Sequence, residues 1–99
     1  MIKHIVLFQF KEDSDVNARA KALKKIKKSL EALRGVVPEL KYIEIGINEN
    51  ANEKYDLSLI SEFESWEDLN AYVVHPEHQK VSAIIRQTME QRACVDYEF

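Results

Sequence analysis

Residues 2–10, IKHIVLFQF, constrain the fold most, because they alternate like a strand and yet offer apolar side chains on both faces. One face carries His4, Val6, Phe8 and Phe10, and the other carries Lys3, Ile5, Leu7 and Gln9. A strand with one face in water shows a polar row on that face. We therefore expect a strand that is covered on both sides.

An amphipathic helix is predicted over about residues 15–34. Apolar residues recur there in steps of three and four, at Val16, Ala20, Leu23, Ile26, Leu30 and Leu33. Ser14 or Asp15 is suited to cap its first turn, and Gly35 lies where a left-handed C-cap is expected. Pro38 prevents the helix from continuing.

The rest of the chain predicts three further strands and two helices. Alternation indicates strands over 39–48, 55–63 and 93–99. A helix over 65–74 begins at Ser65, which is followed three residues later by Asp68 as in a capping box; Trp66, Leu69 and Tyr72 or Val73 follow at helical spacing. Pro76 is suited to the first position of another helix. The expected buried side of that helix consists of Val81, Ile84, Ile85 and Thr88 or Met89.

The element order is β-α-β-β-(α,α)-β over residues 1–99, with no internal repeat or linker, which predicts one domain. This order is typical of the ferredoxin-like α+β fold, a four-stranded antiparallel sheet with its helices on one face. The face without helices would still present Ile5 and Leu7. We expect it to pack on the same face of a second copy, giving a homodimeric α/β barrel.

Composition excludes several classes of protein. The 99 residues are 45% apolar, with two glycines and a formal charge of −3, so disorder and a glycine-rich phosphate loop are excluded. The basic run within residues 19–28 lies on the polar side of the predicted helix and has no interleaved aromatic residues, so we predict no nucleic-acid binding. No segment is long and apolar enough to span a membrane. One cysteine and no signal-peptide pattern favour a cytoplasmic location.

The densest group of reactive side chains is the segment 72–78, Tyr-Val-Val-His-Pro-Glu-His, at the junction of the last two predicted helices. His75 and His78 are too few for a zinc site, because His4 and scattered carboxylates would have to complete it. We therefore predict no metal. Cys94 lies in the middle of a strand and is interpreted as a small buried apolar residue.

Acid–base chemistry by Tyr72 and His78 remains. Histidine exchanges a proton near neutral pH, and a tyrosine hydroxyl can donate a hydrogen bond to a developing oxyanion. The predicted helix dipole would lower the pKa of His78 and keep it basic. In the alternative, the segment is only a capping turn, with His78 bonded to backbone and Tyr72 in the core.

The chain resembles the stress-responsive A/B barrel (Dabb) family over its full length. The resemblance rests on the opening Ile2–Phe8 strand, the 55–65 segment, the 72–78 junction and the closing Asp96-Tyr97. It implies a dimeric α+β barrel. Its best-understood chemistry is the aldol condensation of a plant polyketide cyclase, whose tyrosine and histidine match Tyr72 and His78.

The resemblance also implies roles for other residues. His4 matches a pocket histidine, and Asp96 matches an aspartate that would orient His78. Leu23 would line the pocket from the first helix, and Trp66 and His75 are further expected ligand contacts. Some relatives bind a cation through backbone carbonyls, here within 33–38, and side-chain identity leaves that possibility open.

Three alternative functions follow. In the first, the chain binds a small apolar carbonyl compound and, without a cofactor, catalyses enolisation or aldol-type cyclisation with His78 as base and Tyr72 as oxyanion donor. In the second, it is a non-catalytic stress-response or scaffold protein acting as a homodimer. A third, more distant alternative is a cofactor-free monooxygenase of the same dimeric barrel superfamily.

Overall fold

The structure, a computed structural model, describes residues 1–12 and 15–99. Its elements follow the predicted order. The strands are β1 (Ile2–Phe10), β2 (Tyr42–Ile47), β3 (Leu57–Phe63) and β4 (Met89–Glu98). The helices are α1 (Val16–Glu31), the 3-10 turn η1 (Ala32–Gly35), α2 (Trp66–Val74) and α3 (Pro76–Thr88).

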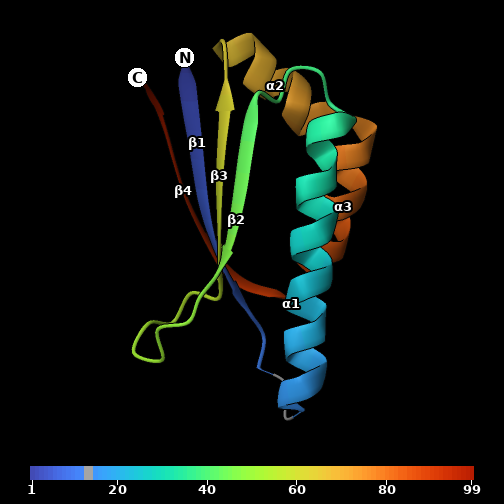
Figure 1. The fold of residues 1–99 in the computed structure, drawn as a ribbon, viewed down its shortest axis with the longest axis vertical. Coiled ribbons are helices and arrows are strands. Elements are labelled where there is room, and N and C mark those ends of the chain that lie inside the picture. Colours follow the sequence, from blue (N-terminus) through green and yellow to red (C-terminus); the bar gives the residue numbers. More distant parts are fainter. Residues whose placement is uncertain (13–14) are drawn as a thin grey trace.

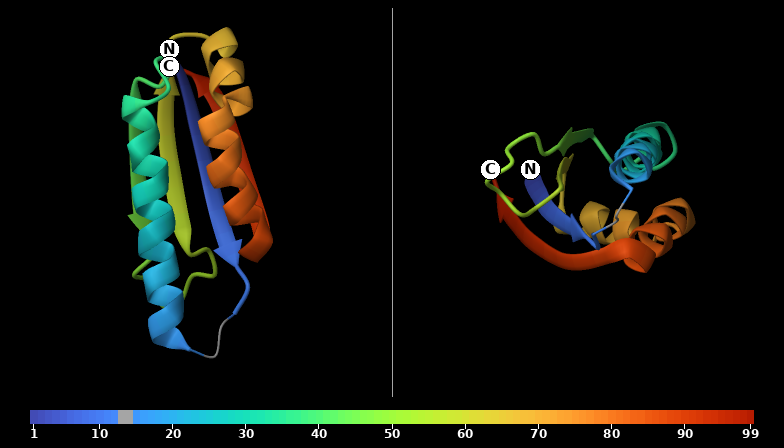
Figure 2. Two further views of the ribbon diagram at one scale, coloured as in Figure 1. Left: turned by 90° about the vertical axis from the view of Figure 1, so that its right-hand side faces the viewer. Right: turned by 90° about the horizontal axis from the view of Figure 1, so that it is seen from below.

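The four strands form one antiparallel sheet in the order β2-β3-β1-β4, and the helices lie on one of its faces (Figures 1 and 2). This is the predicted ferredoxin-like α+β fold. Helices α1 and α3 run along the sheet, and α2 lies at the end where both chain termini meet. The opposite face of the sheet carries no helix.

Strand β1 has the two faces predicted from its alternation. The residues that face the helices are buried: Ile2, His4, Val6, Phe8 and Phe10. The intervening residues are only half-buried, although Ile5 lies opposite both Ile60 and Val95 in the neighbouring strands. One chain therefore covers one face of β1 and leaves an apolar strip on the other.

The start of α1 fits the prediction, and its end does not. The Asp15 side chain accepts hydrogen bonds from the backbone N–H groups of Asn17 and Ala18, while the alternative cap, Ser14, lies outside the described residues. Gly35 has no left-handed φ, so the predicted C-cap is wrong. The helix instead tightens into η1, where the Leu33 carbonyl, within the segment considered for a cation, accepts bonds from two backbone N–H groups.

The junction of α2 and α3 forms as predicted. Ser65 accepts a hydrogen bond from the Asp68 N–H at the start of α2, and Pro76 is the first residue of α3. The predicted buried side of α3 is largely wrong, because only Ile85 is buried and Ile84 is 52% exposed. Helix α3 contacts the sheet near one edge, so fewer of its side chains are covered.

Strand boundaries shift by a few residues. Strand β2 begins at Tyr42 instead of residue 39, because the Leu40 N–H bonds to the Val37 carbonyl and closes a turn before the strand. Strand β4 begins at Met89, directly after α3, and is longer than predicted. Within the described ranges, no helix is long and apolar enough to cross a membrane.

Candidate functional site

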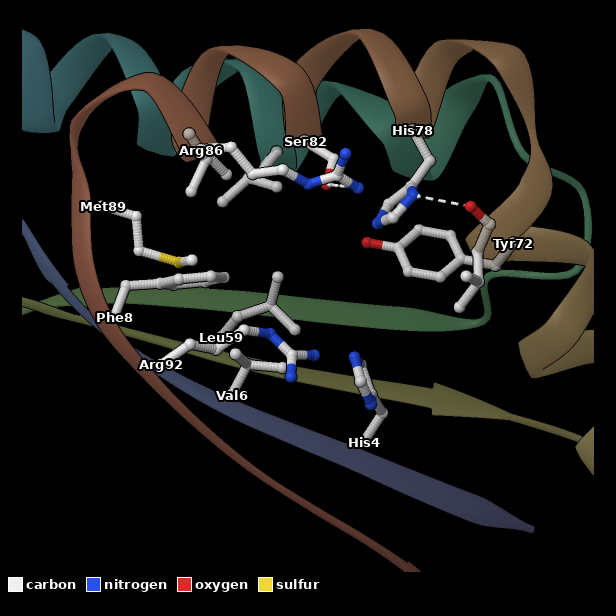
Figure 3. A pocket seen from close by; sticks show the side chains of 13 residues that line it. His4, Val6, Phe8, Leu59, Tyr72, His78, Ser82, Arg86, Met89 and Arg92 are labelled. Atoms are coloured by element: carbon white, nitrogen blue, oxygen red, sulfur yellow. Dashed lines mark hydrogen bonds between the residues drawn. The ribbon is translucent and has the colours of Figure 1, made fainter.

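A cavity of about 200 Å³ lies between the sheet and the α2–α3 pair (Figure 3). Its lining combines apolar side chains with polar ones from β1, β4, α2 and α3. The apolar residues are Val6, Phe8, Leu30, Leu59, Val73, Ile85 and Met89. The polar residues are His4, Tyr72, His78, Ser82, Arg86 and Arg92. Three of the predicted site residues, His4, Tyr72 and His78, are thus brought together.

Tyr72 is fully buried on α2 and points its hydroxyl toward the cavity. Its ring packs on Phe63, with ring centroids 5.1 Å apart. Among the residues that the structure describes, the Tyr72 hydroxyl has no hydrogen-bond partner. Burial raises the pKa of the phenol, so the group stays protonated and can act as a hydrogen-bond donor.

His78 lies in the first turn of α3 with its ring centroid 4.3 Å from that of Tyr72. Its Nδ1 is 3.0 Å from the Val73 carbonyl oxygen, which can only accept a hydrogen bond. The proton of a neutral ring therefore sits on Nδ1, and Nε2 keeps a lone pair. The pKa of His78 is lowered as predicted, but the main cause is burial and not the helix dipole.

Asp96 contacts His4, and this corrects the prediction that it orients His78. Strand β4 pairs with β1 so that Asp96 lies directly opposite His4, and His4 Nδ1 is hydrogen-bonded to Asp96 Oδ1. The group that orients His78 is the Val73 carbonyl. The register of β4 against β1 determines that Asp96 contacts His4, and this register could not be predicted from the sequence.

Three other predicted ligand contacts lie outside the cavity lining. Leu23 is buried in the core on α1. Trp66 is 45% exposed, and its Nε1 donates a hydrogen bond to Glu98 Oε1 at 3.1 Å. His75 caps α3, accepting at Nδ1 a hydrogen bond of 3.1 Å from the Glu77 N–H.

Two cavity arginines were missed by the sequence reasoning. Arg86 follows His78 and Ser82 at intervals of four residues, so all three lie on one face of α3. Arg92 shares a strand face with Cys94 and Asp96, two and four residues further on. Both periodicities are visible in the sequence once His78 and Asp96 are taken as reference points.

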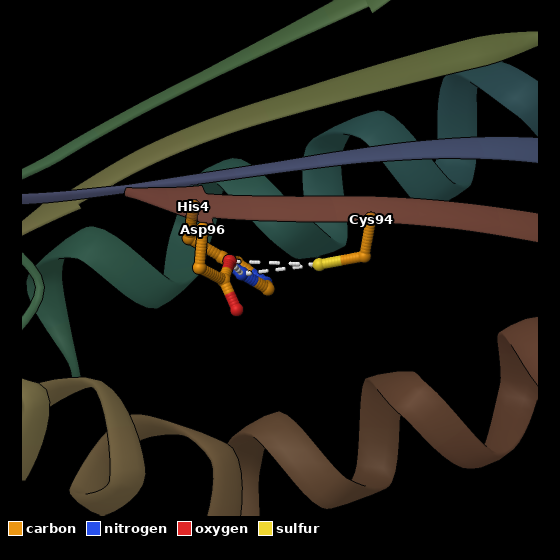
Figure 4. A group of neighbouring side chains, drawn as sticks. All are labelled: His4, Cys94 and Asp96. Atoms are coloured by element: carbon orange, nitrogen blue, oxygen red, sulfur yellow. Dashed lines mark hydrogen bonds and ion pairs between the residues drawn. The ribbon is translucent and has the colours of Figure 1, made fainter. Parts of the chain in front are cut away.

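His4, Cys94 and Asp96 form the one group, within the described ranges, whose ligand atoms could surround a metal ion (Figure 4). Cys94 Sγ lies 3.7 Å from His4 Nδ1 and 3.5 Å from Asp96 Oδ1. Cys94 is exposed, so its prediction as a buried residue is wrong. Partial desolvation and the Asp96 carboxylate raise the pKa of this thiol, which a metal would have to deprotonate.

Comparison with known proteins agrees with the fold. The model of the stress-responsive A/B barrel domain (Dabb) matches residues 2–99. The chain belongs to the Dabb family. A dimeric protein of unknown function with a ferredoxin-like fold from Bacteroides fragilis NCTC 9343 is 40% identical, with a TM-score of 0.93 over 99% of this Dabb chain and 95% of that chain.

Two further solved structures are similar to this Dabb chain. A dimeric ferredoxin-like protein of unknown function from Thermobifida fusca YX is 25% identical, with a TM-score of 0.82 over 99% of this chain and 90% of that chain. The hydroxynitrile lyase from Passiflora edulis is 18% identical, with a TM-score of 0.81 over 97% and 90%, a likeness of fold alone. A search of curated proteins gives no match.

The geometry bears on the capping alternative. His75 does cap α3, and His78 does bond to backbone, as that alternative requires. The non-catalytic alternative predicts satisfied side chains without an open cavity, whereas the Tyr72 hydroxyl has no partner among the described residues and a cavity lies beside it. The junction is therefore a helix cap that also presents two reactive groups to one space.

Proposed function

We propose that this Dabb-family chain binds a small, largely apolar carbonyl compound and enolises it without a cofactor, with His78 as general base. One observation supports this above others: His78 is fixed through Nδ1, so its basic Nε2 is left beside the unpaired Tyr72 hydroxyl. A base and an oxyanion donor in one apolar space are the two groups that enolisation needs.

In the proposed step, His78 Nε2 takes a proton from the carbon next to the carbonyl. The C–H electron pair forms the carbon–carbon double bond, and negative charge moves to the carbonyl oxygen. Tyr72 donates its hydrogen bond to that oxygen, and its raised pKa keeps the hydroxyl protonated. The nucleophilic carbon is then reprotonated by His78, or it attacks a second carbonyl of the same molecule in an aldol-type cyclisation. In the cyclisation, the second carbonyl oxygen becomes an alkoxide and takes the proton back from His78.

The remaining lining suits the same ligand. Val6, Phe8, Leu59 and Met89 provide an apolar wall for a hydrocarbon chain. His4, held by Asp96, lines the same cavity as a second hydrogen-bonding group. We assign Asp96 to positioning His4.

We also propose that the chain works as a homodimer through the sheet face that carries no helix. Ile5, Leu7 and Ile60 are only half-buried there, and Val95 and Tyr97 are 54% and 42% exposed. Relatives from B. fragilis and T. fusca are described as dimeric, which supports a homodimer, and the exposed apolar side chains favour this face. Because the cavity lies on the opposite face, each protomer holds a complete site.

Hydrogen–deuterium exchange tests the enolisation. Neutral methyl ketones such as 2-hexanone would be incubated with protein in D₂O, and deuterium uptake next to the carbonyl would be followed by NMR. We expect His78→Gln and Tyr72→Phe each to slow protein-catalysed exchange by about 100-fold. His75→Asn and Tyr42→Phe are matched controls, because His75 caps α3 and Tyr42 is exposed on β2.

Two outcomes would overturn the proposal. Exchange by His78→Gln and Tyr72→Phe at the wild-type rate would mean that other groups act. Exchange at the uncatalysed rate with wild-type protein across a ketone panel would favour the non-catalytic homodimer.

A further inference from the structure

Two arginines from different elements border the cavity opening. Arg86 extends from α3 and Arg92 from β4, and the guanidinium groups of both point toward the space between them (Figure 3). Both residues are exposed overall, so they lie at the entrance and not at the apolar floor. The entrance is therefore flanked by two fixed positive charges.

Among the residues that the structure describes, neither guanidinium forms an ion pair. The ion pairs of lysine and arginine there are Lys3–Glu62, Arg19–Asp56 and Lys80–Glu77. Arg86 Nη2 donates instead to Ser82 Oγ at 3.2 Å, which orients the guanidinium without removing its charge. Asp96, on the same strand face as Arg92, is engaged by His4.

The cavity thus offers two kinds of polar group to one ligand. A guanidinium presents paired N–H groups in a plane that matches both oxygens of a carboxylate. Tyr72 and His78 line the same cavity, and much of the remaining lining is apolar. We infer that the ligand is an oxo acid, whose carboxylate is held by Arg86 and Arg92 and whose ketone lies at Tyr72.

The carbonyl end of this assignment rests on the proposed function, and the carboxylate end rests on the arginines alone. A carboxylate fits better than a phosphate monoester, because two guanidiniums border the cavity and the chain has no glycine-rich loop to hold a phosphate dianion. With about 200 Å³ available, the apolar chain between the two groups has to be short.

Binding of a matched pair of probes tests the carboxylate site. The probes are 5-oxohexanoate and its methyl ester, which share a ketone and differ in charge, measured by isothermal titration calorimetry. We expect wild-type protein to bind the acid about tenfold more tightly than the ester. Arg86→Gln and Arg92→Gln should each remove most of that preference and leave ester affinity unchanged.

Arg34→Gln is the matched control, since Arg34 lies in η1 and does not line the cavity. Equal affinity for acid and ester, or an acid preference that survives both cavity substitutions, would overturn the inference. Added butyl phosphate that competes more strongly than butanoate would reassign the site to phosphate.

The binding measurement separates this inference from the proposed function. Acid preference lost in Arg86→Gln and Arg92→Gln, without any deuterium exchange, would keep the carboxylate site and reject enolisation. Exchange that depends on His78 but treats acid and ester alike would keep enolisation and reject the carboxylate site. Where both hold, the arginine variants raise KM for the acid more than they raise KM for the ester.

Discussion

At Tyr72 the fold buries a hydroxyl that none of the described residues hydrogen-bonds. A buried polar group without a partner loses its bonds to water and gains nothing in return, which lowers stability. The same isolation keeps the phenol protonated and available to a ligand oxygen. The hydroxyl that we assign to oxyanion stabilisation therefore lowers the stability of the folded chain.

Tyr72→Phe should therefore stabilise the protein while it reduces activity. Removing the unpaired hydroxyl is expected to raise the free energy of unfolding by about 1 kcal/mol, because the ring contact with Phe63 remains. Urea denaturation measures this change. Tyr42→Phe, which removes an exposed hydroxyl bonded to Glu44, should leave stability unchanged. A destabilised Tyr72→Phe would mean that the hydroxyl is satisfied after all.

His78 should make stability depend on pH in the acid range. Its pKa is lower in the folded chain than the ordinary value of 6.5, so the unfolded chain takes up a proton first as pH falls. The stabilisation is complete above pH 6.5 and is lost as pH falls through the folded pKa. NMR titration of the ring would show the low pKa. In His78→Gln, the free energy of unfolding should fall less than in the wild-type protein as pH falls below 6.5. An unchanged pH profile would contradict the lowered pKa.

Sequence reasoning could find residues that lie close together in the chain, but not pairs that are brought together from distant segments. Tyr72 and His78 are six residues apart around Pro76, and local spacing alone predicts that they converge. The partner of Asp96 depends on whether β4 lies beside β1 and in which register, which pairs it with His4. The spacing of Leu23 correctly places it on the buried face of α1. That face packs on a core larger than the cavity, and Leu23 lies in the part of the core that does not line the cavity.

Among the elements, the α2–α3 junction positions the site most directly. His75 has extended backbone angles, φ −62° and ψ 134°, which end α2 and direct the chain into Pro76. That turn brings His78 back over Tyr72 and places Nδ1 at the Val73 carbonyl, the acceptor that fixes its tautomer. Local rules predicted this turn because proline and its neighbour restrict the backbone whatever the tertiary context.

His75 is expected to act through the helix and not through the ligand. His75→Ala removes the acceptor of the Glu77 N–H and should lower the free energy of unfolding by about 1 kcal/mol. His75→Asn should retain stability, because asparagine is a good N-cap. Thermal or urea unfolding measures both. Equal loss of ligand affinity in the two variants, with stability retained in His75→Asn, would make His75 a ligand contact.

Local rules failed where packing could choose between two ways of ending an element. Gly35 can adopt a left-handed conformation, but the chain satisfies the last carbonyls of α1 with a 3-10 turn, so glycine's freedom is not used. The apolar residues of α3 predicted a wide buried stripe, and Ile84 remains exposed because α3 rests near the sheet edge.

The whole molecule has two faces with different tasks. The helix-covered face encloses the core and the cavity, and the other face leaves Ile5, Leu7 and Ile60 half-buried at its centre. Burying the apolar uncovered face of a sheet against a second layer is energetically favourable. The element order and the two-faced first strand together were enough to predict this architecture, because both depend on pattern and not on exact boundaries.

Val95→Asp tests the association of two such faces. Val95 is 54% exposed and lies opposite Ile5 in the sheet. A charge buried between two copies would weaken the dimer by at least tenfold in dissociation constant, about 1.4 kcal/mol. Sedimentation equilibrium measures the mass. Val16→Asp, the same change at an exposed end of α1, should stay dimeric; dimers of Val95→Asp at wild-type strength would place the interface elsewhere.

The position of β1 between β3 and β4 also sets an order of events during translation. Ile2 pairs with Phe63 on one side and with Glu98 on the other, so the strand made first receives its second neighbour from the strand made last. While the ribosome adds α2 and α3, β1 has an open edge and two apolar faces in the nascent chain. Such late, long-range pairing slows folding and leaves an aggregation-prone strand exposed. The chain therefore depends on rapid completion of its sheet after synthesis of β4.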